Sequence, residues 1–96
     1  MLIARVIGTT IATIKDEKLS GSKLLLVRQT DEHGEEFGKP FVAIDTVSAG
    51  VGDLVLTAHG SSARQTTITD KKPVDAVIMA VIDSMEVEGK EVFRKS

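Results

Sequence analysis

Cysteine, tryptophan and tyrosine are absent from this 96-residue sequence, and phenylalanine occurs only three times. The lack of cysteine excludes disulfide bonds, thiolate metal sites and cysteine nucleophiles, and it suits a reducing compartment, which predicts the cytoplasm. The shortage of aromatic residues argues against a surface on which nucleic-acid bases stack. The core is therefore expected to be built from aliphatic and β-branched side chains.

Neither the charge nor the apolar segments point to a nucleic acid or a membrane. With 12 basic and 14 acidic residues the net charge is -2, which provides no basic surface for nucleic acid. The apolar residues from Met1 to Gly8 are interrupted by Arg5 and are too few to span a bilayer, so they predict a first strand. The length fits a single domain over residues 1–96, and because a core of this size leaves much surface exposed, self-association would add stability.

Short runs rich in valine, isoleucine and threonine, separated by polar turns, predict an all-β fold. Gly8 interrupts the first run and predicts a bulge or bend in a long, curled strand. Five short strands with one small helix predict a small, partly open, OB-like Greek-key β-barrel. The expected strands cover residues 2–14, 23–30, 41–45, 54–58 and 75–83.

Two further local signals complete the expected fold. Ser62, with Gln65 three positions later, can form a capping box, which predicts one short helix after Gly60. Near the end of the chain, Glu88-Gly89 predicts a hairpin.

The stretch from residue 43 to residue 64 crowds glycines, serines, a histidine and acids around one strand. His59 and Ser61 suggest the active site of a hydrolase. A nucleophile elbow, however, needs a glycine on both sides of the serine, and the second glycine is missing here. Gly50-x-Gly52 followed by an acid resembles half of a dinucleotide fingerprint, yet a strand follows instead of a helix and the third glycine is absent. Tight turns explain the glycines and serines of this stretch better than a hydrolase site or a dinucleotide-binding site does.

The other titratable residues do not form a recognisable site. His33 and His59 lack the paired spacing that metal ligands usually show. Asp45, Asp75 and Asp83 stand at strand edges, where carboxylates commonly accept hydrogen bonds from loop amides, and they would form a cluster only if the fold gathered them. We predict no catalytic residue, no cofactor and no metal site.

Seven motifs follow one another along the whole chain. They read Leu-Ile-Ala-Arg-Val-Ile-Gly-Thr, Lys-Leu-Leu-Leu-Val-Arg, Ala-Ile-Asp-Thr-Val, Ala-Gly-Val-Gly-Asp, His-Gly-Ser-Ser-Ala-Arg, Pro-Val-Asp-Ala and Val-Ile-Asp. In this order they closely resemble the bacterial microcompartment vertex proteins, the pentameric shell family of ethanolamine-utilisation compartments and carboxysomes. The sequence departs from the family at Ser48, where glycine is usual, and at Asp53, where glutamate is frequent.

The resemblance implies a fold and a structural role. It implies an OB-like barrel, a homopentamer, and a place in the cytoplasm at the corners of a polyhedral shell, with hexameric shell proteins as partners and no nucleic acid or membrane. A flat sheet of hexagonal tiles cannot close, so such a shell needs five-fold units whose wedge angle sets the closure.

Two segments are expected to form the contacts of such a ring. The loop Ser48, Ala49, Gly50, Val51, Gly52 and Asp53 is placed at the axial opening, where glycines let backbones approach closely. The segment Gly60, Ser61, Ser62, Ala63 and Arg64 is placed at a subunit interface, because the arginine fork can bind a neighbour's carboxylates or carbonyls.

The alternative function is an OB-type oligonucleotide-binding module without catalytic activity. Such a module needs aromatic residues on one sheet face and a basic groove. This chain offers only Phe37, Phe41 and Phe93 and is slightly acidic. Arg94-Lys95 is too short for a nucleic-acid arm and is predicted to be a frayed end.

Overall fold

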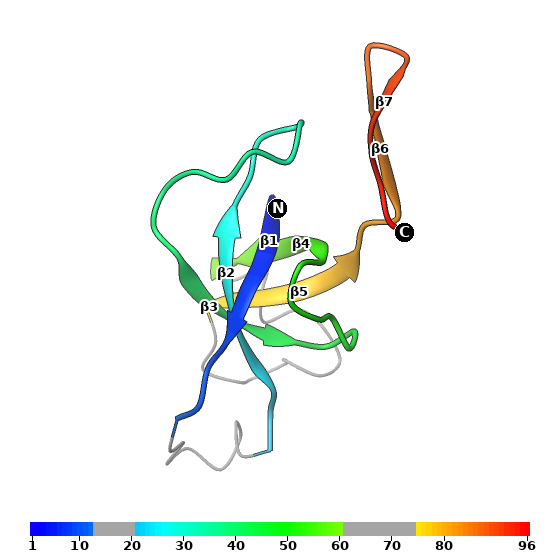
Figure 1. Ribbon diagram of the computed structural model, residues 1–96. Helices are drawn as coiled ribbons and strands as arrows, with labels where there is room; N and C mark the ends of the chain where they lie inside the picture. Colours follow the sequence, from blue (N-terminus) through cyan, green and yellow to red (C-terminus); the bar gives the residue numbers. More distant parts are fainter. Residues whose placement is uncertain (13–20, 61–74) are drawn as a thin grey trace.

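The computed structural model describes residues 1–12, 21–60 and 75–96 (Figure 1). The secondary-structure elements named within these ranges are all β-strands. No described helix is long and apolar enough to cross a membrane. The predicted short helix from Ser62 lies outside the described residues. The strands are β1 (Leu2–Thr9), β2 (Leu24–Gln29), β3 (Phe41–Asp45), β4 (Leu54–His59), β5 (Ala76–Val81), β6 (Ser84–Val87) and β7 (Lys90–Arg94).

The first five strands form a closed barrel in the order β1-β2-β3-β5-β4. β1 pairs antiparallel with both β2 and β4, and only β3 and β5 pair in parallel, at Ile44 with Val77 and at Asp45 with Ile78. The predicted five-stranded OB-like barrel is confirmed. The expectation that it is partly open is wrong, because the amino end of β1 pairs with β4 from Leu2 to Arg5 and closes the sheet.

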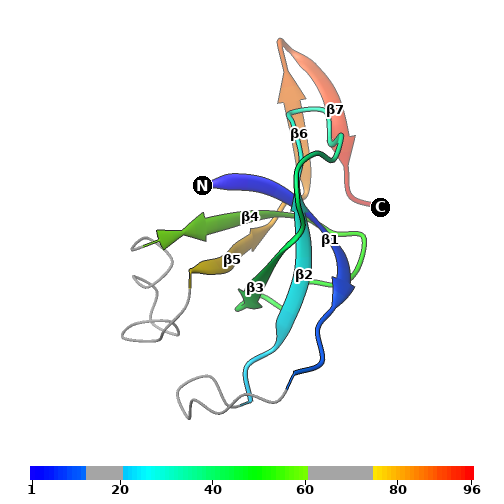
Figure 2. The ribbon, with the colours of Figure 1, turned by 90° about the vertical axis from the view of Figure 1, so that its left-hand side faces the viewer.

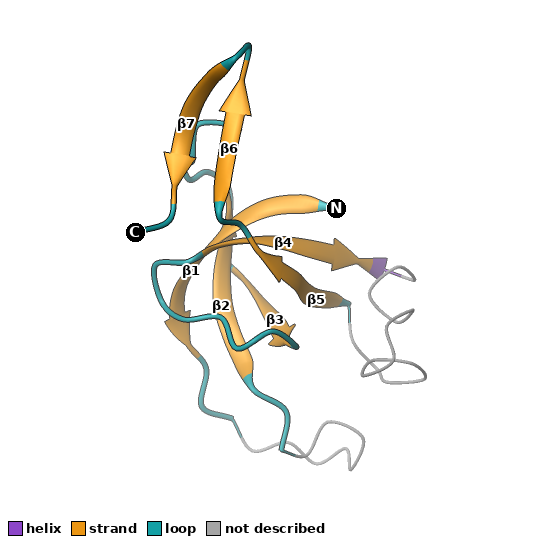
Figure 3. Ribbon diagram, turned by 90° about the vertical axis from the view of Figure 1, so that its right-hand side faces the viewer, coloured by secondary structure: helices purple, strands orange, loops and turns teal. Residues whose placement is uncertain are grey.

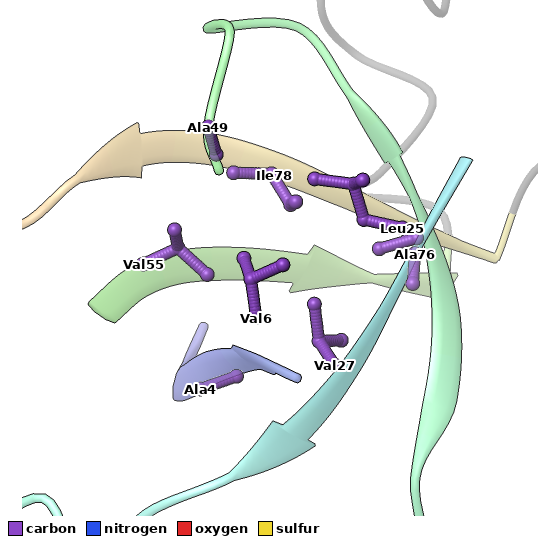
Figure 4. Close-up of a cluster of buried hydrophobic side chains, with 9 residues drawn as sticks. Ala4, Val6, Leu25, Val27, Ala49, Val55, Ala76 and Ile78 are labelled. Atoms are coloured by element: carbon purple, nitrogen blue, oxygen red, sulfur yellow. The ribbon is translucent and has the colours of Figure 1, made fainter. Parts of the chain in front are cut away.

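The barrel interior is filled by small aliphatic side chains, as the composition predicted (Figure 4). Alternating residues of β1 and β2 point inward, which makes Ala4, Val6, Leu25 and Val27 almost fully buried. The register of β1 against β2 shifts between Val6 and Gly8, so the predicted bulge at the glycine is confirmed. β1 ends at Thr9, five residues earlier than the sequence pattern suggested.

β6 and β7 form a separate two-stranded sheet that projects from the barrel (Figures 1 and 3). Glu88 and Gly89 link them with φ angles of 52° and 80°, as a tight two-residue hairpin turn requires. The predicted hairpin is therefore confirmed. It contains no buried residue, in contrast to every barrel strand.

Candidate subunit-contact surface

The loop after β3 begins at a buried carboxylate. The side chain of Asp45 is only 1% exposed and lies 3.5 Å from the ammonium group of Lys23. Its Oδ1 accepts a hydrogen bond from the amide of Val47 at 3.0 Å, while Lys23 Nζ also donates to the carbonyl of Ala49 at 2.9 Å. One lysine, directly before β2, therefore ties the start and the middle of the loop to the beginning of that strand.

The middle of the loop is anchored in the barrel core. Ala49 is 1% exposed and points into the apolar cluster beside Ile78 (Figure 4). Just before it, Thr46 Oγ1 donates to the carbonyl of Ile78 at 2.7 Å. The loop is thus attached to β5 by a hydrogen bond and by a buried methyl group.

The end of the loop is a turn closed by its own acid. Asp53 Oδ2 accepts from the amide of Gly50 at 2.8 Å, and the amide of Asp53 donates back to the Gly50 carbonyl at 3.0 Å. The amide of Gly52 donates to the Val6 carbonyl at 2.8 Å, and the Val6 amide donates to the Asp53 carbonyl at 2.9 Å. The turn therefore pairs with the bulged part of β1.

Arg5 joins this turn to the loop that follows β2. Its Nη1 donates to the Gly52 carbonyl at 3.0 Å and its Nη2 donates to the Gly34 carbonyl at 3.4 Å. Its Nε lies 3.7 Å from a carboxylate oxygen of Glu36. Sequence reasoning missed this role, although a single cation inside an apolar run was a visible signal.

These contacts hold a well-defined loop that presents one apolar side chain to solvent. Val51 is 64% exposed at the tip, two residues after buried Ala49. Gly52 has a φ of 95°, a conformation that residues with a side chain rarely adopt. A Cβ on Gly50 would lie 3.9 Å from Asp53 Oδ2, an ordinary contact, so only a neighbouring molecule could make Gly50 a point of close approach.

Ser48 occupies a backbone conformation that favours glycine. Its φ is 59°, in the left-handed region, which costs a residue with a Cβ about 1–2 kcal/mol. Ser48 is the position at which the resemblance led us to expect glycine. The positive φ of this position gives the physical reason for that preference.

The second predicted contact segment is described only at its first residue. Gly60 is exposed, has a φ of 62°, and donates its amide to the Asp75 carbonyl at 3.0 Å. Ser61, Ser62, Ala63 and Arg64 lie outside the described residues. The structure therefore brings the start of this segment beside β5, and the placement of Arg64 stays a prediction.

His59 takes part in side-chain packing. Its ring meets the edge of Phe41 with centroids 5.0 Å apart at 62°, and its Nε2 lies 2.8 Å from Thr57 Oγ1. Burial lowers the pKa of His59, which favours the neutral ring. Ser61, the serine that the hydrolase hypothesis would pair with His59, lies outside the described residues.

The three aspartates at strand edges are not gathered into a site. Asp45 caps the loop as predicted, whereas Asp75 and Asp83 accept hydrogen bonds through their backbone carbonyls. In the described ranges 1–12, 21–60 and 75–96, no three histidine or acidic side chains converge as metal ligands would.

The carboxyl end of the chain returns to the loop. The backbone amide of Lys95 donates to the Asp83 carbonyl at 2.7 Å. The side-chain ammonium group of Lys95 lies 3.8 Å from Asp53 Oδ1. A shallow groove separates Val51 and Gly52 from the end of β7. The prediction that Arg94 and Lys95 fray is wrong, because Arg94 is in β7 and Lys95 is bonded across the base of the hairpin.

A family model described as ethanolamine utilisation protein EutN/carboxysome matches residues 1–83. The chain belongs to this family. The resemblance noted from the motifs is therefore confirmed. The match ends directly before β6, so the projecting hairpin lies beyond it.

Individual relatives extend the similarity into the hairpin. The carboxysome shell vertex protein CcmL of Synechococcus elongatus is 42% identical over 95 residues, which are 99% of this chain and 96% of that protein. The structure of Gloeobacter violaceus CcmL superimposes with a TM-score of 0.92 at 39% identity, covering 99% of this chain and 98% of that one. The GrpN pentameric microcompartment shell protein from Rhodospirillum rubrum gives a TM-score of 0.82 at 40% identity, covering 91% of this chain and 99% of that one.

Proposed function

We propose that this chain is a structural shell protein whose homopentamers cap the vertices of a polyhedral bacterial microcompartment in the cytoplasm. The observation that carries the proposal is the nearly full-length similarity to a shell vertex protein and to a pentameric shell protein. The partners are hexameric shell proteins, and no nucleic acid or membrane is involved. The chain performs no catalytic step.

The bonding of the loop Ser48–Asp53 supports a structural role. The Asp45 carboxylate and the Asp53 turn are bonded to groups of the same chain, so they define a shape. In a cyclic ring each copy uses two different patches, and the angle between them sets the number of copies. We place this loop at the axial opening or a subunit contact, with Val51 as its exposed side chain.

The segment from Gly60 to Arg64 forms a second contact in this proposal. Arg64 would bind carboxylates or carbonyls of the adjacent copy, because its planar fork matches both. Replacing Arg64 by alanine should weaken the ring, as measured by native mass spectrometry over a dilution series. An unchanged ring would remove this residue from the interface.

The oligonucleotide alternative gains no support from the placement of the aromatic residues. Phe41 packs against His59 in the barrel, whereas Phe37 lies in the loop after β2 and Phe93 lies in the hairpin. Three phenylalanines on three separate elements provide no shared stacking platform.

Native mass spectrometry of the purified protein tests the proposed function. We expect a species of five chains at micromolar concentration. A monomer, or a ring of six chains, would contradict the proposal. Mixing with a hexameric shell protein should then produce closed particles, whereas the hexameric protein alone should give sheets or tubes.

A further inference from the structure

Two arginines lie side by side on the outer face of the barrel. Arg5 and Arg28 are direct partners in the antiparallel pairing of β1 with β2, and residues opposite each other in such a pairing point to the same side of the sheet. Their chain neighbours Ala4, Val6 and Val27 fill the interior. Because like charges directly opposite each other destabilise a sheet, this pair needs acceptors that offset its repulsion.

The loop after β2, residues 30–40, supplies these acceptors. Arg5 Nη2 donates to the Gly34 carbonyl at 3.4 Å, and Arg28 Nε donates to the Gly38 carbonyl at 2.8 Å. The Glu36 carboxylate lies 3.7 Å from Arg5 Nε. Both arginines therefore hold the same loop against the barrel.

Within the described residues, Arg5 is the one of the two that also reaches a second loop. Its Nη1 donates to the Gly52 carbonyl at 3.0 Å, in the loop Ser48–Asp53. In Figures 1 and 2 the loop after β2 rises above the barrel strands, whereas the loop between β3 and β4 stays beside them. One guanidinium group therefore connects two loops that extend in different directions.

The loop after β2 is held by its own bonds as well. Asp31 Oδ1 accepts from the amides of His33 at 2.8 Å and Glu35 at 3.0 Å, and the Phe37 amide donates to the Gln29 carbonyl at 2.9 Å. The backbone bonds of Glu35 and then of His33 lower the pKa of Asp31, which keeps this acceptor ionised. A loop bonded in this way moves as a unit when one part of it is displaced.

Gly34 leaves the space that the Arg5 guanidinium group occupies. A Cβ at this position would lie 3.1 Å from Arg5 Nη2, closer than nearly all real contacts of a Cβ. Gly38, in the same loop, has a similar φ of 79° against 82°, but a Cβ there would meet nothing within 4 Å. The two glycines therefore differ in whether a side chain would push against Arg5.

We infer that Arg5 couples the two loops, so that a displacement of the loop after β2 is transmitted to the loop Ser48–Asp53. The guanidinium group is planar and rigid, so its two Nη atoms cannot move independently. A shift of the Gly34 carbonyl or of Glu36 therefore changes the bond to the Gly52 carbonyl.

The coupling makes Arg5 a positioning residue for the loop that carries exposed Val51. A molecule that binds the loop after β2 would change how this side chain is presented. The effect lies within one chain and does not depend on the number of chains in the assembly.

Two alanine substitutions separate transmission through Arg5 from backbone strain. Gly34→Ala and Gly38→Ala carry similar strain, and only the first meets Arg5. The readout is amide hydrogen exchange at Gly50 and Gly52 in the assembled protein. Gly34→Ala should raise the exchange rate about fivefold, the lower end of coupling between sites, whereas Gly38→Ala should leave it within about twofold.

A second pair of variants changes charge without changing the backbone. Glu36→Gln and Glu35→Gln each remove one negative charge from the same loop, but the ion pair with Arg5 is formed by Glu36. Glu36→Gln should raise the exchange rate at Gly52, and Glu35→Gln should not.

Arg5→Lys completes a double-mutant cycle. Lysine keeps the charge but lacks the planar fork. In this background Gly34→Ala and Gly38→Ala should have equal effects at Gly52, as should Glu36→Gln and Glu35→Gln.

A difference within either pair that disappears with Arg5→Lys supports the coupling. Equal exchange at Gly52 within both pairs, or a difference that persists undiminished with Arg5→Lys, would overturn it. The proposed function is tested separately by the native mass of the assembly, which neither result concerns.

Discussion

The loop Ser48–Asp53 and the β6–β7 hairpin are both surface features, but they are held in opposite ways. The loop is anchored by buried Ala49, by Lys23 and by its pairing with β1. The hairpin is bonded to itself and at its base, and its apolar side chains are half-buried at most. One surface is therefore anchored in the barrel core, whereas the other is held by its own strand pairing and by the contacts at its base.

The largest effect is expected in the hairpin, which we predict to contact an adjacent copy in the proposed pentamer. Phe93→Asp should raise the concentration of half-dissociation of the ring about 30-fold or more, because a buried aromatic anchor at an interface contributes about 2 kcal/mol or more. Native mass spectrometry across a dilution series measures this value. Circular dichroism should still show a folded β protein.

Glu86→Ala is the matched control, since this residue lies on the polar face of the same hairpin. It should leave the dissociation of the ring within a few-fold of the original. Equal loss of the ring in both variants would mean that the two faces of the hairpin do not differ in function.

The next largest effect concerns the loop, within a single chain. Asp45→Ala should lower the free energy of unfolding by about 2 kcal/mol, because it leaves the Val47 amide and the Lys23 ammonium group without their acceptor. Urea unfolding at a dilution at which native mass spectrometry shows single chains gives this value without a contribution from assembly. Asp83→Ala, at the base of the hairpin, should change it by no more than about 0.5 kcal/mol.

Two glycines with similar backbone angles, one in the loop and one in the hairpin, allow a direct comparison of how each region contributes to the stability of the barrel. Gly52 and Gly89 have φ angles of 95° and 80°, and a Cβ on either would meet nothing within 4 Å. Gly52→Ala should destabilise the monomeric barrel by about 1–2 kcal/mol, because its strain falls on a loop that unfolds with the barrel.

Gly89→Ala should leave the monomeric barrel nearly unchanged and weaken the ring instead. Urea unfolding and native mass spectrometry separate the two outcomes. Equal destabilisation of the monomer by both substitutions would show that the hairpin is part of the cooperative barrel.

The smallest effect is expected at Ser48. Ser48→Gly removes left-handed strain of about 1–2 kcal/mol and adds unfolded-state entropy of about 0.5–1 kcal/mol, so the net gain should be about 0.5 kcal/mol. Thermal unfolding of the single chain at the same dilution measures it. Ser84→Gly, in the extended strand β6, should give no gain, and a loss at Ser48 would contradict the assigned strain.

The sequence predicted those parts of the fold that depend on local chemistry. Gly8 marked the bulge, Glu88-Gly89 marked the hairpin turn, and the strand from Phe41 to Asp45 was predicted to the residue. These features follow from strand propensity and turn geometry, which short segments carry.

Features that depend on distant contacts were not predictable in the same way. The sequence predicted a partly open barrel. The pairing of β1 with β4, which closes the barrel, joins segments some fifty residues apart, and no local sequence pattern specifies such a pairing. The bonds from Lys23 to Ala49 and from Arg5 to Gly52 also join distant segments. The axial placement of the loop stays a prediction, since it depends on other copies of the chain.

The central claim is that the loop is formed within one chain whereas the hairpin is ordered by its neighbour. Amide hydrogen exchange of the ring and of the single chain obtained by dilution, each identified by native mass spectrometry, tests it most directly. The Gly50 and Gly52 amides should be equally protected in both states, and the amides across Ser84–Arg94 should lose protection in the monomer. Hairpin amides protected equally in both states, or a loop that loses protection in the monomer, would contradict it.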